Sequence, residues 1–315
     1  MAAPVNTVQS YTMNNIIENL AKVIYNKDPE ETPLFTSLKK SKTDTTNPEW
    51  LTDTLRSSRV NANIEGTDIT AEAKGEQTRL SNQCQLFIDA VRVSGTADAQ
   101  NKAGMATRMA YEMMKSGKEQ RLDIERALFA NQAKDAGSSS TPRYMAGMGS
   151  WVHTNVEAAA GGADPTGNGT DTRTDATQAA FSQTKFDDVM RKIYQATGSI
   201  KSKDVYLNPF QMDVAIGFTG NNNQRNTVDN GKVENYIAAY KTQYGMVYFK
   251  LSLECRARDV WVLDPTMWEI KQFRPMKRVD LAKTGDSEQK AILTELTLCA
   301  KNEKSSGLIA DCTTS

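Results

Sequence analysis

Residues able to perform acid–base, nucleophilic or metal chemistry are few and scattered along this sequence. His153 is the single histidine among 315 residues, which excludes a zinc site with two histidine ligands and a histidine-pair mechanism. Cys84, Cys255, Cys299 and Cys312 lie far apart, and no C-x-x-C motif occurs. We interpret them as reduced, partly buried residues, with disulfides as the second interpretation.

Adjacent carboxylates occur at Asp187-Asp188 and Glu30-Glu31. Asp187 and Asp188 lie in a predicted helix, where successive side chains point about 100° apart, so the pair cannot converge on one substrate. The sequence has no G-x-S-x-G, H-E-x-x-H, Walker or dinucleotide-binding motif. We therefore predict a protein that is not an enzyme and binds no cofactor or metal; a carboxylate-using enzyme is the weaker alternative.

Basic residues gather in one place, although the 38 cations and 38 acids of the chain balance to a net charge of zero. The basic cluster consists of Lys271, Arg274, Lys277, Arg278 and Lys283, with Asp280 as its single acid. A nucleic-acid surface usually shows a wider basic field, because affinity rises with the number of phosphate contacts. Contact with DNA remains one interpretation, but we predict that Arg274, Lys277 and Arg278 face carboxylates of a neighbouring subunit.

The length and composition indicate about two domains with an ordinary core. Hydrophobic residues make up 39% of the chain and the mean hydropathy is −0.55. No segment approaches the ~18 apolar residues of a membrane helix, and the first residues do not resemble a secretory signal. We therefore expect no membrane association.

Two segments near the N-terminus lack the apolar content for a core of their own. Residues 1–49 resemble an arm, in which Pro29, Pro33 and Pro48 disfavour helix and central strand. Residues 50–93 follow a pattern of strand, polar loop and strand, with Leu86 and Ile88 on one face of the second strand beside Cys84 and Ala90. A two-stranded hairpin is marginal in water, so we expect a neighbouring chain to cover it.

The strongest helix prediction covers residues 96–131, with Ser94 and Thr96 as cap candidates. Met105, Met109 and Met113 recur every four residues, which predicts a stripe packed in the core. A helix of this length would span about 50 Å.

The remaining chain alternates between helix, strand and loop. A loop is predicted at 135–175, and a helix at 184–197 with Phe186, Val189, Ile193 and Tyr194 inward and Gly198 as its stop. Asn208-Pro209 predicts the start of a helix to about residue 218, and 219–231 a polar loop. Strands are expected at 205–207, 246–253, 259–263, 268–273, 290–300 and 307–311.

The order of arm, hairpin, long helix, α/β region and returning strands resembles the major capsid proteins of tailed bacteriophages, with the Hong Kong ninety-seven-type fold. Four short strings carry this resemblance: Glu49–Asp53, Val93–Ala97, Asp259–Asp264 and Asp280–Asp286. Their order and spacing extend it over nearly the whole chain.

The resemblance implies an α+β fold divided into five parts. These would be an N-terminal arm (1–49), an extended loop over an adjacent subunit (50–93), a peripheral domain with a spine helix (94–134), an axial domain (135–265) and strands that return to the peripheral domain (266–315). Only 49 residues precede the hairpin, so we expect a separate scaffold protein or none. No motif matches the lysine–asparagine crosslink of some relatives.

The resemblance also implies a function. The chain would be a structural subunit that assembles as pentamers and hexamers into an icosahedral shell, made in the bacterial cytoplasm and found in the virion. The shell would enclose double-stranded DNA without reading its sequence, and scaffold, portal and decoration proteins could join it. The residues expected at intersubunit contacts are Trp50, Leu55, Arg59, Leu86, Ile88, Arg274, Lys277 and Arg278. A tail or decoration subunit is the alternative.

Overall fold

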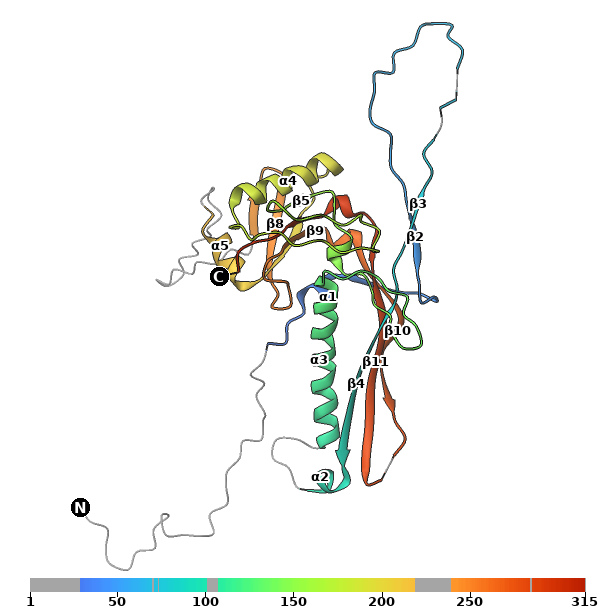
Figure 1. Ribbon diagram of the computed structural model, residues 1–315, viewed down its shortest axis with the longest axis vertical. Coiled ribbons are helices and arrows are strands. Elements are labelled where there is room, and N and C mark those ends of the chain that lie inside the picture. Colours follow the sequence, from blue (N-terminus) through green and yellow to red (C-terminus); the bar gives the residue numbers. More distant parts are fainter. Residues whose placement is uncertain are drawn as a thin grey trace, which may run out of the picture.

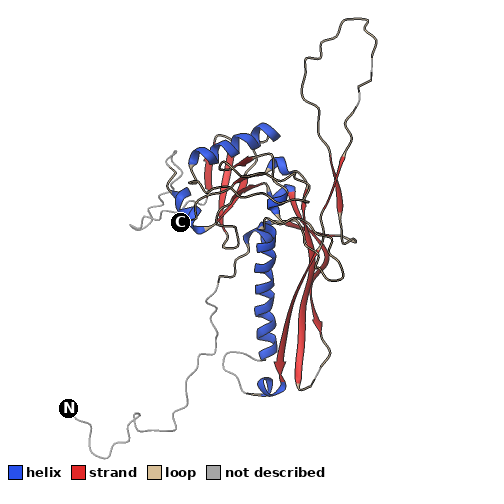
Figure 2. Ribbon diagram, viewed as in Figure 1, coloured by secondary structure: helices blue, strands red, loops and turns tan. Residues whose placement is uncertain are grey.

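A computed structural model describes residues 29–69, 71–72, 74–100, 107–218, 239–283 and 285–314. The chain forms an elongated unit of long strands beside one long helix, and a more compact unit with helices over a second sheet (Figures 1 and 2). A thin loop extends far from both units (Figure 1). This mixture of helix and sheet confirms the predicted α+β class.

The elongated unit is built on a four-stranded sheet of order β1-β10-β11-β4. Its strands are β1 (Lys39–Lys42), β10 (Trp268–Asp280), β11 (Ser287–Ala300) and β4 (Gln85–Ser94). β11 pairs antiparallel with both β10 and β4, whereas β1 runs parallel to the first residues of β10. Helix α3 (Arg108–Phe129) packs along this sheet and buries Ile124 and Leu128 completely.

The predicted helix 96–131 is wrong in its first third. Helix α2 (Gly95–Ala99) ends at Gln100, whose backbone is extended, and α3 begins afresh after Thr107. Local capping explains the break, because the Ser94 side chain accepts from the Ala97 N–H and that of Thr107 from the Ala110 N–H. The buried stripe is confirmed at Met109 and Met113, whereas Met105 lies outside the described residues.

The predicted hairpin 50–93 is also wrong in its second limb. The hairpin consists of β2 (Glu49–Thr52) and β3 (Thr78–Ser81), while β4 is a separate strand paired with β11 of the same chain. In β4 the buried side chains are Phe87 and Val93, so Leu86 and Ile88 lie on the opposite face. Both faces of β4 are apolar, and alternation alone did not identify the inward one.

The compact unit contains a six-stranded sheet of order β5-β12-β9-β6-β8-β7. Its strands are β5 (Val156–Glu157), β12 (Gly307–Ile309), β9 (Val260–Leu263), β6 (Lys203–Leu207), β8 (Gly245–Leu251) and β7 (Ala239–Thr242). The strands predicted at 205–207, 246–253, 259–263 and 307–311 are therefore confirmed within a few residues, and those at 268–273 and 290–300 are longer, as β10 and β11. The predicted polar loop at 219–231 lies outside the described residues.

Two helices of the compact unit follow their sequence signals. α4 (Gln183–Thr197) buries Phe186, Val189 and Ile193 and stops at Gly198, whose φ is 64°. Tyr194 is 38% exposed, which corrects its predicted inward position. α5 (Pro209–Ile216) is capped by Asn208 as predicted. The short 3-10 helices are η2 (Met148–Ser150), η3 (Pro265–Met267) and η4 (Glu303–Ser305).

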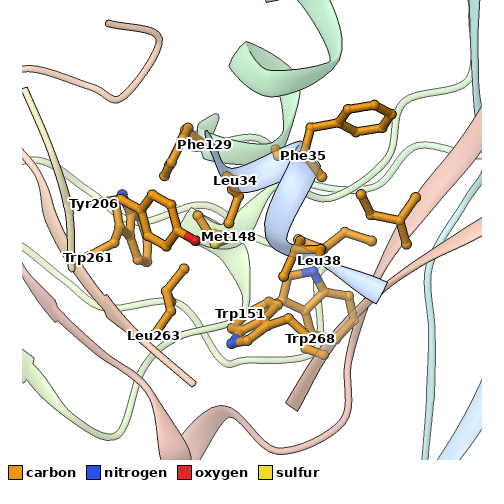
Figure 3. Packing of buried hydrophobic residues seen from close by; sticks show 14 of the residues in the cluster. Leu34, Phe35, Leu38, Phe129, Met148, Trp151, Tyr206, Trp261, Leu263 and Trp268 are labelled. Carbon is orange, nitrogen blue, oxygen red and sulfur yellow. The ribbon is translucent and has the colours of Figure 1, made fainter. Parts of the chain in front are cut away.

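One apolar core joins the two units. In Figure 3 the side chains of Trp151, Trp261, Trp268 and Tyr206 belong to one cluster with Phe129 from the end of α3, and each of these five residues is 1% exposed or less. Trp151 comes from the predicted loop 135–175, which has little regular structure but contributes to the core. The end of the spine helix and the compact sheet therefore share one interior.

The arm contains more structure than its prolines predicted. Pro33 stands at the first position of helix α1 (Pro33–Ser37), where a proline costs no hydrogen bond. Leu34, Phe35 and Leu38 are buried in the shared core, so this part of the arm lies on its own chain (Figure 3). Residues 1–28 of the predicted arm lie outside the described residues.

Candidate assembly interface

The extended loop, residues 53–77, carries apolar side chains that the described part of its own chain leaves uncovered. Leu55 and Ile69 are 100% exposed, and Val60 and Ile64 are also almost fully exposed. The loop projects from the body of the molecule (Figure 1), and its long limbs are linked by ion pairs of Arg56 and Arg59 with Glu72. Burying a large aliphatic side chain is worth about 1.5–3 kcal/mol, so these four favour a covered position.

The root of the extended loop is fixed by buried polar contacts. Asn82 is fully buried; its Nδ2 donates to the carbonyls of Leu298 at 2.7 Å and Ala146 at 3.2 Å, and its Oδ1 accepts from the Ala146 N–H at 2.8 Å. Trp50 Nε1 donates to the Ala300 carbonyl at 2.8 Å, and its ring lies 5.4 Å from that of Trp151. Trp50, expected at a subunit contact, therefore anchors the loop to its own chain.

Leu86 and Ile88 form a small apolar strip on the face of β4 that points away from α3. Leu86 is 40% exposed and Ile88 is 59% exposed, and Ile88 stands opposite Leu293 of β11. Two aliphatic side chains at this exposure on a regular sheet face are suited to contact with another chain.

The basic cluster is divided by the sheet. Arg274 Nε lies 2.8 Å from Glu295 Oε2, and Arg143 Nη2 lies 2.6 Å from the other carboxylate oxygen. Glu295 is buried, so Arg274 already has an acidic partner within its own chain, which it shares with Arg143. Lys277 and Arg278 are exposed, and no ion pair within the described part of the chain involves either of them.

Lys277 and Arg278 also point to opposite sides of the sheet. Arg278 pairs with Ile292, which is buried against Met109 and Met113 of α3, whereas Lys277 pairs with Leu293 on the other face. The sequence grouped Arg274, Lys277 and Arg278 as one surface, and the two-residue period of β10 separates them.

A buried carboxylate ties the arm to the spine helix. Glu125 Oε2 accepts from the Phe35 N–H at 2.6 Å and Oε1 from the Leu34 N–H at 2.9 Å, which completes the first turn of α1. Burial raises the pKa of Glu125, while these two backbone donors and the Ser252 hydroxyl lower it in part. Ser37 Oγ lies 2.6 Å from the Tyr206 hydroxyl, so α1 bonds to both units.

The side chains considered for catalysis or metal binding have the following surroundings in the described part of the chain. No group of three histidine, cysteine or acidic side chains is arranged there to hold a metal ion. His153 Nδ1 lies 3.3 Å from the Trp151 carbonyl and 3.7 Å from Glu303, and Asp188 pairs with Arg191. The four cysteines are free and buried in the structure. None of the described helices combines the length and apolar content required to cross a membrane.

The sequence matches the model of one protein family, the SU10 major capsid protein, over residues 5–313. The chain belongs to this family. It is a major capsid protein, the subunit of a phage head shell, and the alternative of a tail or decoration subunit is set aside.

Other comparisons agree with this family. The capsid protein is 25% identical to the major capsid protein of Escherichia phage Phieco32 over 337 residues, covering 95% of each chain. Its fold is similar to the capsid subunit of cyanophage A-1(L), with a TM-score of 0.66 and 13% identity over 98% of this chain and 100% of that one. For the capsid of cyanophage P-SCSP1u the TM-score is 0.59 and the identity 12%, with the same coverage.

Several residues that shape this interface were missed by the sequence interpretation. Asn82, Glu125 and Glu295 are polar residues buried to 1% exposure or less. Asn82 and Glu125 lie in segments rich in other polar residues, and Glu295 alternates with the apolar residues Leu296 and Leu298 as a solvent-facing side chain would, so neither type nor spacing marked them as buried. The signal exists only in three dimensions, where backbone N–H groups or arginines surround each side chain.

Proposed function

We propose that this capsid protein assembles through its extended loop into an icosahedral shell of pentamers and hexamers that encloses double-stranded DNA. The observation that carries the proposal is the full exposure of Leu55 and Ile69 on a loop whose root is rigidly anchored. A loop held at its base and apolar along its limbs is suited to lie on an adjacent subunit. Arg59, paired with Glu72, holds the two limbs together.

The apolar strip of Leu86 and Ile88 is the proposed counterpart on the adjacent subunit. The strip lies on a regular sheet and the loop has four exposed aliphatic side chains, so their contact would remove both from water. In this proposal the elongated unit corresponds to the peripheral domain and the compact unit to the axial domain, with residues 29–49 as the described part of the arm.

The protein performs no catalysis in this proposal, and its function is association. It is made in the host cytoplasm and contacts DNA without sequence specificity. Scaffold, portal and decoration proteins are its proposed further partners. The balanced net charge favours close packing of identical copies, since a large charge of one sign would oppose it.

A loop deletion tests the proposal. Residues 56–74 are replaced by a short glycine–serine linker, which keeps both hairpin strands and Asn82. We expect a soluble subunit with an unchanged melting temperature, because the described residues within this segment are exposed. Electron microscopy should show closed shells for the unmodified protein and none for the deletion.

A matched pair of substitutions refines the test. Leu55→Ser with Ile69→Ser should impair shell closure, whereas Thr54→Ser with Asp68→Asn, on the same limbs, should not. Closed shells from the deletion variant would contradict the proposed role of the loop, as would unfolding of the isolated subunit.

A further inference from the structure

β10 and β4, the two neighbours of β11 in the elongated sheet, carry opposite charges at the same height. Ile292 of β11 pairs with Arg278 of β10 on one side and with Asp89 of β4 on the other. Directly paired residues of an antiparallel sheet lie on the same face, so the three side chains form one row across the sheet. The row has a cation at one end and a carboxylate at the other.

Both ends of this row are open edges of the described sheet. β4 is the last strand in the order, and β1, on the other side of β10, pairs only with Glu269–Gln272. The sheet at the height of the row therefore consists of β10, β11 and β4 alone. Exposed sheet edges are surfaces on which another chain can pack.

The two charges cannot neutralise each other within one chain. They are separated by two strand spacings, roughly 10 Å, with the Ile292 side chain between them. Among the described residues no ion pair involves Asp89 or Arg278. Each copy thus presents an unmatched cation on one edge and an unmatched carboxylate on the other.

A second carboxylate strengthens the acidic edge. Asp123 of α3 lines a shallow groove between this helix and β4, together with Arg126. Burial raises the pKa of Asp123, and the negative charge of Asp89 adds to this effect while Arg126 opposes it. The two acids therefore lie close enough to repel, and a cation from outside would relieve that repulsion.

We propose that Arg278 of one subunit binds Asp89 of the next, so that the elongated units associate edge to edge. The contact joins one surface of a subunit to a different surface of the next, so it repeats from copy to copy. It closes a ring where the rotation between neighbouring subunits is a whole fraction of a turn. Pairing of another subunit's backbone with β10 before Arg278 is disfavoured, because Pro275 and two register shifts between Gln272 and Lys277 interrupt the strand there. Side chains make the contact, and the equal height of Arg278 and Asp89 fixes its register. The inference rests on the proposed shell assembly.

Charge exchange tests the pairing. Arg278→Glu and Asp89→Arg should each reduce the yield of closed shells at least about tenfold, since a like-charge contact replaces an ion pair. The double variant should recover most of the yield. Lys277→Glu is the matched control, because Lys277 is adjacent in sequence but lies on the other face. Asp89→Arg should not rescue it.

Crosslinking gives a readout that does not depend on the yield. An arginine–aspartate ion pair holds its Cα atoms farther apart than the about 7 Å that a disulfide can span, so a short bis-maleimide is used instead of oxidation. Asp89→Cys and Arg278→Cys are made in separate chains and co-assembled, so that no link between the two positions can form within one chain. The four native cysteines are buried. Treatment of the mixed particles should give a linked dimer on a denaturing gel, absent when either variant is assembled alone.

The outcomes separate this inference from the proposed function. Shells that form normally with either single reversal, or a double variant as defective as the singles, would overturn the pairing and leave the capsid function intact. Mixed shells of the two cysteine variants that give no linked dimer with the bis-maleimide would do the same. If Asp89→Arg rescued Lys277→Glu as well as it rescues Arg278→Glu, the effect would depend on overall charge and not on a specific pair, which would also overturn the pairing. Failure of the unmodified protein to assemble would contradict the proposed function itself.

Discussion

The carboxylate of Glu125, in the spine helix, accepts a hydrogen bond from the backbone N–H of Phe35 at 2.6 Å. The second carboxylate oxygen accepts from the Leu34 N–H. The side chain of Thr32, the N-cap residue of α1, makes no capping hydrogen bond. Glu125 thus replaces a local cap with one from another segment. The arm is fixed to the body by a residue 90 positions away in the sequence.

Removal of this carboxylate should release α1. We expect Glu125→Ala to destabilise the subunit by about 2–4 kcal/mol, because two buried N–H groups lose their acceptor. Glu125→Gln should cost less, since its amide oxygen can still accept one bond. Urea unfolding of the isolated subunit measures both, with exposed Glu119→Ala on the same helix as the control. Equal stability of all three variants would contradict the role of Glu125.

A carboxylate between the spine helix α3 and the sheet should prevent folding. Met109 is 5% exposed and packs with Val93, Met113 and Ile292. Met109→Asp should cost several kcal/mol, since the buried charge has no partner there, and the subunit should aggregate. The control is Met114→Asp, because Met114 lies on the same helix and is 55% exposed. Soluble yield and melting temperature distinguish the two variants; a normal Met109→Asp subunit would show that this face of α3 is not packed.

The stability of the subunit should depend on pH through Asp259. Burial raises the pKa of Asp259 to about 6, although the Arg256 guanidinium, 2.9 Å from its Oδ2, opposes the shift. A raised pKa means that the folded state holds the proton more strongly than the unfolded state. The stabilisation that Asp259 adds to the free energy of unfolding is therefore fully present below about pH 4 and is lost as the pH rises through about 6.

The Asp259→Asn variant isolates this effect. Its stability relative to the native protein should increase from pH 4 to pH 7, by up to about 3 kcal/mol. Arg173 and Arg258 lower the pKa of nearby Asp311 despite its burial, and this shift changes stability with pH in the opposite direction. The quantity to measure is therefore the difference in stability between the two proteins at each pH. Parallel pH profiles for the two proteins would show that Asp259 ionises normally.

The single histidine should be dispensable for assembly. His153 is 38% exposed, and its nearest acid is Glu303 at 3.7 Å. We expect His153→Ala to give shells in the native yield, because the Glu303 carboxylate keeps its bond to the Thr154 hydroxyl. Particle counts by electron microscopy check this. Loss of a processing step with normal assembly would instead favour the enzymatic alternative.

The sequence by itself determined the elements whose signals are local. Gly198 ends α4 because a left-handed residue is required there, and Asn208-Pro209 starts α5 because both residues suit a first turn. The order of the elements and the short strings at Glu49–Asp53 and Asp259–Asp264 were sufficient to indicate the capsid family. These features depend on neighbours within a few residues, so they can be interpreted without coordinates.

Only the tertiary structure decided which face each strand buries and which charges meet. Leu86 and Phe87 are equally apolar, and only the position of α3 makes Phe87 the buried one. Arg274 finds Glu295 within its own chain, while Arg278, four residues later, is aligned with Asp89 through β11. These relationships depend on strand register between distant segments, and a shift of one residue would reverse every one of them.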